Sequence, residues 1–149
     1  MIDMKSFFLD SFNLNFHTNQ ALFERLIEHE DVLPDKTIKL ASHIINIHHI
    51  WLSFLAEKSA ESLAWDMLPL SYLCVLNNQN HNETTHFIEF IDCSEASSNN
   101  HLDSFIFPEN ISRILQHILT HSAYHRGQIV LTLKENNLSF PNMDWTSIR

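Results

Sequence analysis

The stretch ILQHILTHSAYHRGQIV, residues 114–130, carries three histidines spaced four residues apart among regularly repeating apolar residues. Apolar residues that recur at i, i+3, i+4 and i+7 predict an amphipathic helix. On this helix His121 and His125 occupy positions of the inward apolar row, whereas His117 lies at its flank. The stretch therefore predicts a long helix that turns at least two imidazoles toward the core.

Three further blocks of the sequence show the same helical period. They run from about Met4 to His29, from about Asp35 to Glu57 and from about Ser71 to Asp92, and the last helix is expected from about 108–110 to 136. Pro34 cannot continue a helix and fits the start of the second one. Four long helices with shortish connections predict an all-α fold, a four-helix bundle.

Composition and charge narrow the class of protein. The 149 residues are 44% hydrophobic, which suits one globular domain spanning residues 1–149. The single glycine excludes the glycine-rich loops that bind dinucleotides or nucleotide phosphates. Nine basic residues against eighteen acidic ones give a net charge of −9. We therefore expect no nucleic-acid ligand, because binding to a duplex needs clustered positive charge.

The sequence also bears on the compartment. Cys74 and Cys93 form no CxxC pair, and nothing suggests a disulfide framework. The N-terminus lacks the basic and apolar regions of a signal peptide. No apolar run reaches the ~18 residues that a membrane span needs. We expect a soluble cytoplasmic protein that does not associate with membranes.

Four irregular features complete the expected organisation. The connector of residues 58–70 is expected to hold a short turn near Trp65, and residues 93–110 form a polar loop that could contain a hairpin. The polar run NNQNHNETTH, residues 77–86, predicts that the third helix is the least stable or lies beside a solvent-filled cleft. The tail, residues 138–149, is rich in large apolar residues and is expected to fold back over the bundle.

The histidine series has two possible explanations. A buried imidazole must be hydrogen-bonded or ligated, and two imidazoles at i and i+4 can share a metal ion. The Glu of HExxH is missing, so a third ligand would have to come from another helix. The second helix offers His43, His48 and His49; its wheel favours His48 and leaves His43 at the edge of the apolar arc. Periodicity alone does not decide between them.

Two motifs make the chain similar to the DinB-like metal-binding helical bundles. HSAYHRGQI, residues 121–129, resembles the HxxxHRGQ signature of that family's last helix, and SHIINIHHIW, residues 42–51, resembles its second-helix motif. Weaker similarities are FHTNQALFERL with Asn19 and FPNMDW with Asp144. Together these marks span nearly the whole chain.

The resemblance implies a four-helix bundle with crossed connections, often dimeric, in which His43, His121 and His125 hold a divalent metal ion. Three imidazoles with an open coordination position are typical of a catalytic metal, and zinc, nickel, iron and manganese all fit such a set. Relatives include thiol-dependent S-transferases and isomerases, which use low-molecular-weight thiols such as bacillithiol or mycothiol. The implied function is thus a metalloenzyme acting with such a thiol on a small electrophile.

Two alternatives stay open. One is a non-catalytic metal-binding stress or damage-inducible protein, and the other is a dimeric interaction module whose histidines belong to the core.

His48 stands where relatives commonly carry an acid, so it is either a partner of a ligand or a substitute ligand. Candidates for a general base are His117, His86 and Asp144, although each is more simply a solvated surface residue.

Further expectations concern the oligomeric state, three residues of the last helix and the effect of pH. The large apolar residues Trp51, Phe54 and Leu55 widen the apolar face of the second helix and predict a homodimer. Arg126 and Gln128 have structural roles, and Gly127, which costs helix stability, is explained by the close approach of another helix or the tail. Because histidines bind metal only when neutral, metal loss is expected below roughly pH 6.

Overall fold

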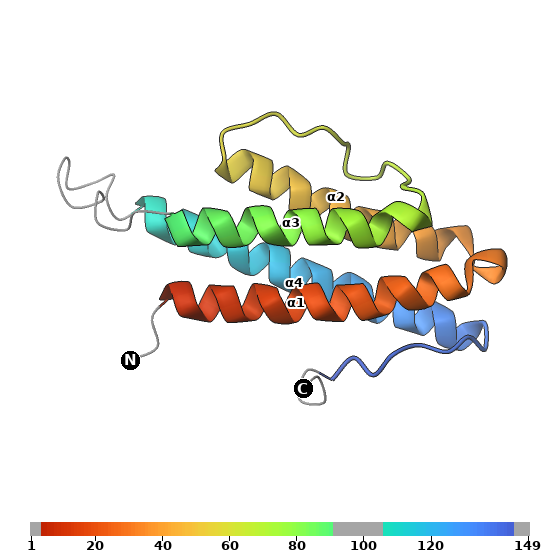
Figure 1. Ribbon diagram of the computed structural model, residues 1–149. Helices are drawn as coiled ribbons and strands as arrows, with labels where there is room; N and C mark the ends of the chain where they lie inside the picture. Colours follow the sequence, from red (N-terminus) through yellow and green to blue (C-terminus); the bar gives the residue numbers. More distant parts are fainter. Residues whose placement is uncertain (1–3, 91–105, 145–149) are drawn as a thin grey trace.

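The computed structural model describes residues 4–90 and 106–144, and all regular structure within them is helical. The elements are α1 (Met4–Glu28), the 3-10 turn η1 (Glu30–Val32), α2 (Asp35–Leu55), α3 (Leu70–Phe90) and α4 (Ile106–Glu135) (Figure 1). The predicted all-α four-helix bundle is confirmed. α4 begins slightly before the predicted residues, since a proline is tolerated in the first turn of a helix.

The helices pack in an order that differs from their order in the chain. α1 packs chiefly against α3 and α2 chiefly against α4, while α2 with α3 and α1 with α4 form the other main pairs. The connector after α2 runs back along the bundle, so α2 and α3 point in the same direction (Figure 1). This crossover makes α2 and α4 neighbours, and these are the two helices that carry the predicted histidines.

The ends of two helices show how the chain leaves them. α2 ends in a Schellman motif, in which Lys58 N–H donates to Ser53 O and Glu57 N–H donates to Phe54 O. Glu57 has a φ of 54° there. α4 ends in the same way around Asn137, at a φ of 56°, as the predicted C-cap requires. Asparagine tolerates the left-handed region better than glutamate does.

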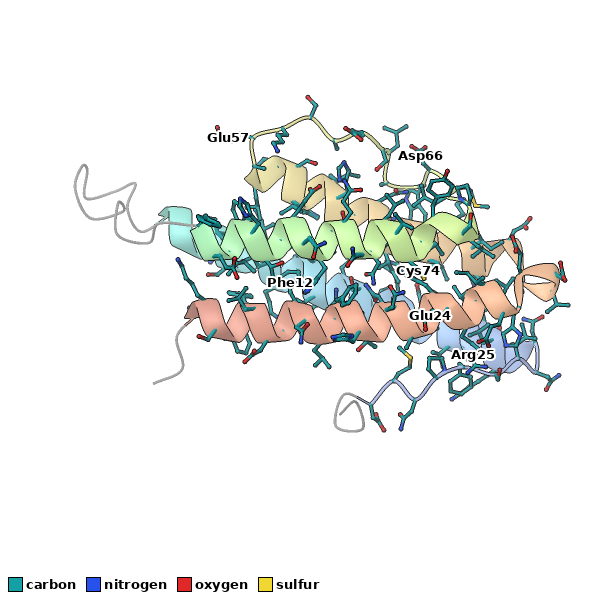
Figure 2. All side chains as sticks on the ribbon, in the orientation of Figure 1. Phe12, Glu24, Arg25, Glu57, Asp66 and Cys74 are labelled. Atoms are coloured by element: carbon teal, nitrogen blue, oxygen red, sulfur yellow. The ribbon has the colours of Figure 1, made fainter. Side chains whose placement is uncertain are left out.

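Two apolar clusters lie at the two ends of the bundle. The first joins the end of α1, the start of α2, the start of α3 and the end of α4, with Leu22, Phe23, Ile44, Leu73 and Ile129 among its members. The second joins the other ends, with Phe8, Phe12, Ile88, Leu115 and Ile118 among its members; Figure 2 labels Phe12. Burial of these side chains supplies most of the stabilisation of the fold.

A layer of buried polar side chains lies between the apolar clusters. Asn77, Asn80 and Thr84 of α3 are buried, and Asn80 Nδ2 donates to Ile45 O at 3.1 Å. The buried residues of the polar run therefore face hydrogen-bonding partners in the interior, whereas Asn78, Gln79, Asn82, Glu83 and His86 of the same run are exposed. The solvent-filled cleft beside the run stays a prediction. The low stability of α3 stays a prediction.

The tail folds back as predicted, as far as the structure describes it. Leu138 and Met143 pack against the first apolar cluster, and Ser139 Oγ lies 3.0 Å from His29 Nε2. Trp145 and Ile148 lie outside the described residues. Most of the predicted 93–110 loop lies outside them as well.

Most of the wide apolar face of α2 packs against other helices of the same chain. Trp51 and Leu55 pack against the second apolar cluster, and only Phe54 of the three residues named above is exposed, at 63%. A homodimer stays a prediction, which light scattering at micromolar concentration can test. Among the described helices, none is long and apolar enough to cross a membrane.

Candidate metal centre

Three histidines from two helices meet on the α2–α4 side of the bundle. His43 Nε2 lies 3.1 Å from His121 Nε2, and His125 Nε2 lies 3.1 Å from the same atom. His43 and His125 are buried, and His121 is half-buried. One ligand atom from each of the three lies within 4.8 Å of the others. The structure thus brings together the three residues that the resemblance pointed to, and they could hold a metal ion.

Hydrogen bonds on the far side of two rings decide which nitrogen faces inward. His43 Nδ1 lies 2.7 Å from the carbonyl oxygen of Ala64, and His125 Nδ1 lies 2.6 Å from Gln128 Oε1. Both oxygens are acceptors, so each Nδ1 must carry the proton and donate it. The Nε2 atoms of His43 and His125 then present lone pairs toward His121. Outer hydrogen bonds of this kind are typical of histidines that bind metals.

The donor set fits a divalent cation. Two nitrogens bound to one tetrahedral ion at about 2.0–2.1 Å lie about 3.3 Å apart, close to the 3.1 Å observed here. A proton on His121 Nε2 can be donated to only one neighbouring lone pair at a time. A cation at the centre would satisfy all three nitrogens together.

The electrostatics of the cluster favour neutral imidazoles. Burial lowers the pKa of His121 to about 4, with further lowering by the nearby His125 and His43. Burial also lowers the pKa of His43, partly opposed by its hydrogen bond to Ala64. Only neutral imidazole binds metal. We therefore expect the pH at which the metal is lost to lie below roughly pH 6, the value expected for histidines with an ordinary pKa.

The connector between α2 and α3 covers His43. The ring of Trp65 stacks on that of His43 with 3.6 Å between centroids and 4° between planes. The backbone oxygen of Asp66 accepts a hydrogen bond from Asn46, and Leu68 N–H donates to Ser42 Oγ; Figure 2 labels Asp66 in this connector. The predicted turn near Trp65 therefore serves to hold the histidine in place.

His48 has a different environment. It is buried, and its Nε2 lies 2.8 Å from Thr84 Oγ1. The Thr84 hydroxyl donates to Asn80 O, so His48 Nε2–H must be the donor to Thr84. Burial, together with His81 and His49, lowers the pKa of His48 to about 3. The helical wheel was right about the depth of His48, but the residue is a hydrogen-bonded core histidine and lies outside the cluster.

The candidate bases are scattered. His117 is exposed, and its ring centroid lies 5.5 Å from those of His121 and of Trp51. The exposed ring of His86 packs against Phe90 on α3. Asp144 is exposed in the tail. Of the three, His117 is the one with a ring contact to the cluster.

Arg126 links α4 to α1 from within the polar layer. Its Nη1 donates to Asn15 Oδ1 at 2.6 Å and to Asn19 Oδ1 at 2.7 Å. Asn19 in turn donates to Asn77 of α3 at 3.3 Å. Burial lowers the pKa of Arg126 to about 10, so it remains charged at neutral pH. The structural role expected for Arg126 is present in these contacts.

Gly127 corrects another expectation. Among the described residues, no atom of another helix or of the tail lies within 4 Å of the position that a Cβ would take. The residue is exposed. The prediction that another helix comes close to this glycine is wrong for the described helices, and nothing in the described residues explains the glycine.

The sequence reasoning missed three partners of the cluster. Gln128 was assigned a structural role, yet its side chain accepts from His125. The i,i+3 spacing of the two residues was a usable signal. Ala64 and Trp65 gave no such signal, because they reach His43 from an irregular segment about twenty residues away.

Comparison with known proteins bears on this geometry. A family model described as the DinB family matches residues 35–148. The match covers more than half of the chain and includes both helices of the cluster. It does not include α1, where Asn19 lies. No curated protein and no solved structure matches the chain.

Proposed function

The chain belongs to the DinB family, and on that premise we propose that it binds a divalent metal ion through His43, His121 and His125. We propose further that it is an S-transferase or isomerase acting with a low-molecular-weight thiol on a small electrophile. The observation that carries the first proposal is the convergence of three Nε2 atoms, two of which are fixed as lone-pair donors by Ala64 and Gln128.

The chain's own residues suit this chemistry. A divalent ion with an open position lowers the pKa of a thiol that binds it and so favours the nucleophilic thiolate. Ala64 and Gln128 hold two imidazoles in the required tautomer, and Trp65 covers His43 from solvent. His117, at the exposed edge of the cluster, is the group to which we assign uptake of the thiol proton. In a transfer reaction the sulfur would bond to the electrophilic carbon, and the leaving group would depart with its electron pair.

Metal analysis is the first test. We expect about one divalent ion per chain after dialysis of the purified protein, and much less in the His121→Ala and His125→Ala variants. Removing one of three imidazoles leaves too few ligands for tight binding. Absence of metal from wild-type protein reloaded with zinc, nickel, iron or manganese would overturn the proposal and leave the histidines as core residues.

A transfer assay separates the enzyme from the non-catalytic alternative. The metal-loaded protein is incubated with a panel of small thiols and a simple alkylating electrophile, and loss of free thiol is followed. We expect acceleration that the His121→Ala variant lacks and that His117→Gln reduces without loss of metal. Metal binding without acceleration for any thiol would favour the metal-binding stress protein.

A further inference from the structure

An open pocket lies between α2 and the connector, next to the Trp65 ring that stacks on His43. Its volume is about 340 Å³, and its lining residues are Lys36, Lys39, Leu40 and Trp65. Leu40 is buried, whereas the two lysines and Trp65 are exposed. Small-molecule sites are clefts of about 300–1,000 Å³ that bury most of their ligand, so this open pocket has room for one end of a small molecule. The pocket is thus accessible to a ligand and has a mostly apolar lining with two cationic groups.

The two lysines give the pocket a charge opposite to that of the whole chain. Lys36 and Lys39 are two of nine basic residues in a chain of net charge −9. Arg25 pairs with Glu28, whereas no ion pair of Lys36 or Lys39 occurs within the described part of the chain. Lys39 Nζ lies 5.7 Å from the centroid of the Trp65 ring. An anion entering the pocket would therefore meet two ammonium groups that form no ion pair with a carboxylate among the described residues.

Trp65 connects the pocket to the histidine cluster. The same ring that lines the pocket stacks on His43. Lys39 and Lys36 precede His43 by four and seven residues on α2, which corresponds to about 6 and 10 Å along the helix axis. A small molecule of that length that passes the edge of the Trp65 ring would place an anionic group near the lysines and its reactive end near the histidines.

We propose that Lys36, Lys39 and Trp65 form a subsite for the carboxylate or phosphate group of a small substrate that reacts at the neighbouring histidine cluster. The subsite rests on the proposed function for its role, but its binding of anions does not depend on a metal. Substrates that carry an oxyanion group about 6–10 Å from the reacting atom are the class that it selects.

The test measures anion binding to the metal-free protein by nuclear magnetic resonance. The probes are succinate and inorganic phosphate at constant ionic strength, and the signal is the indole N–H of Trp65, assigned with the Trp65→Phe variant. We expect a saturable shift with a millimolar dissociation constant for at least one probe, and the stronger probe identifies the preferred oxyanion. Binding should weaken as salt is raised, because the lysines are exposed.

Matched variants decide the outcome. Lys36→Met with Lys39→Met should weaken binding about tenfold, as expected for two exposed charge contacts. Lys58→Met with Lys134→Met removes the same charge elsewhere and should leave binding unchanged. Absence of a saturable shift, or equal binding by the two double variants, would overturn the subsite. Neither result depends on metal content, so failure of the subsite and failure of the metal site are distinguishable.

Discussion

His43 Nε2 and His121 Nε2 lie 3.1 Å apart, although 78 positions separate the two residues in the sequence. The contact exists because the long connector after α2 places α2 against α4. Each ring is also restrained by its neighbours, His43 by Trp65 and Ala64, and His121 by His125. Restrained imidazoles lose little freedom when they bind a cation.

The choice between His43 and His48 can be tested directly. We expect His43→Ala to lose most of the bound metal and His48→Ala to retain it, because the imidazole of His48 is bonded to Thr84. His48→Ala should instead lower the free energy of unfolding by about 2 kcal/mol or more, through a lost buried hydrogen bond and a cavity. Metal content after dialysis and urea unfolding are the measurements. The reverse pattern of metal loss would show that the family correspondence at His43 is wrong.

The pH dependence of stability should report His48. Its pKa is about 3 in the folded chain and about 6.5 in the unfolded chain. Between about pH 6.5 and pH 3 the unfolded state therefore takes up a proton that the folded state does not. The stabilisation is present above about pH 6.5 and is lost as pH falls toward about 3. For the metal-free protein we expect a loss of about 2 kcal/mol from this residue between about pH 7 and pH 5.

The control for this prediction is His48→Gln, which can donate to Thr84 but does not titrate in this range. Urea unfolding at a series of pH values should give a flatter profile for the variant than for wild type. Parallel profiles would mean that His48 is not the buried neutral group described here.

Gln128 should tune the metal affinity. Its Oε1 accepts from His125 Nδ1, and loss of such an outer partner costs about 10–100-fold in metal affinity. We expect Gln128→Leu to show this loss of affinity in a competition with a chelator. Gln128→Glu should keep an affinity close to that of wild type, because its carboxylate can accept the same hydrogen bond. Gln116→Leu, an exposed change on the same helix, is the control. Unchanged affinity in Gln128→Leu would show that His125 needs no such partner.

Arg126 should matter more for stability than an exposed arginine does. Arg126→Lys replaces the guanidinium with a shorter side chain that ends in a strongly hydrated ammonium, so Asn15 Oδ1, Asn19 Oδ1 or both lose the donor that Nη1 supplies. We expect the free energy of unfolding to fall by about 1–3 kcal/mol. The matched change Arg25→Lys, at the surface, should alter it by less than about 0.5 kcal/mol. Equal effects would argue that the buried network contributes nothing specific.

Gly127→Ala should stabilise the protein. Space is open where the new methyl group would lie, and alanine is favoured over glycine inside a helix by about 1 kcal/mol. The reciprocal change Ala123→Gly, at another exposed position of α4, should cost a similar amount. Thermal unfolding of both variants measures the effect. Destabilisation by Gly127→Ala would reveal a requirement for glycine that this chain alone does not show, such as a contact with a second copy.

Much of the fold and part of the candidate site were readable from the sequence. The apolar period located all four helices, because a helix buries one face and its residues repeat every 3.6 positions. Pro34 marked the start of α2, since proline lacks an N–H and fixes φ. The spacing of His121 and His125 placed both rings on one helical face, and the similarity to a known family supplied His43.

Only the tertiary structure decided the rest. The wheel of α2 favoured His48 because periodicity reports depth and cannot say which neighbour a buried ring will meet. His48 meets Thr84 of α3, whereas His43 meets α4 and the connector. The polar run of α3 has a buried face and an exposed face, and composition does not show which of its amides are buried and hydrogen-bonded. Trp65, Ala64 and the lysine pocket depend on how an irregular connector docks, and such docking follows no period. Residue types and their spacing determined the helices and their buried faces. Packing between the helices determined which imidazoles converge.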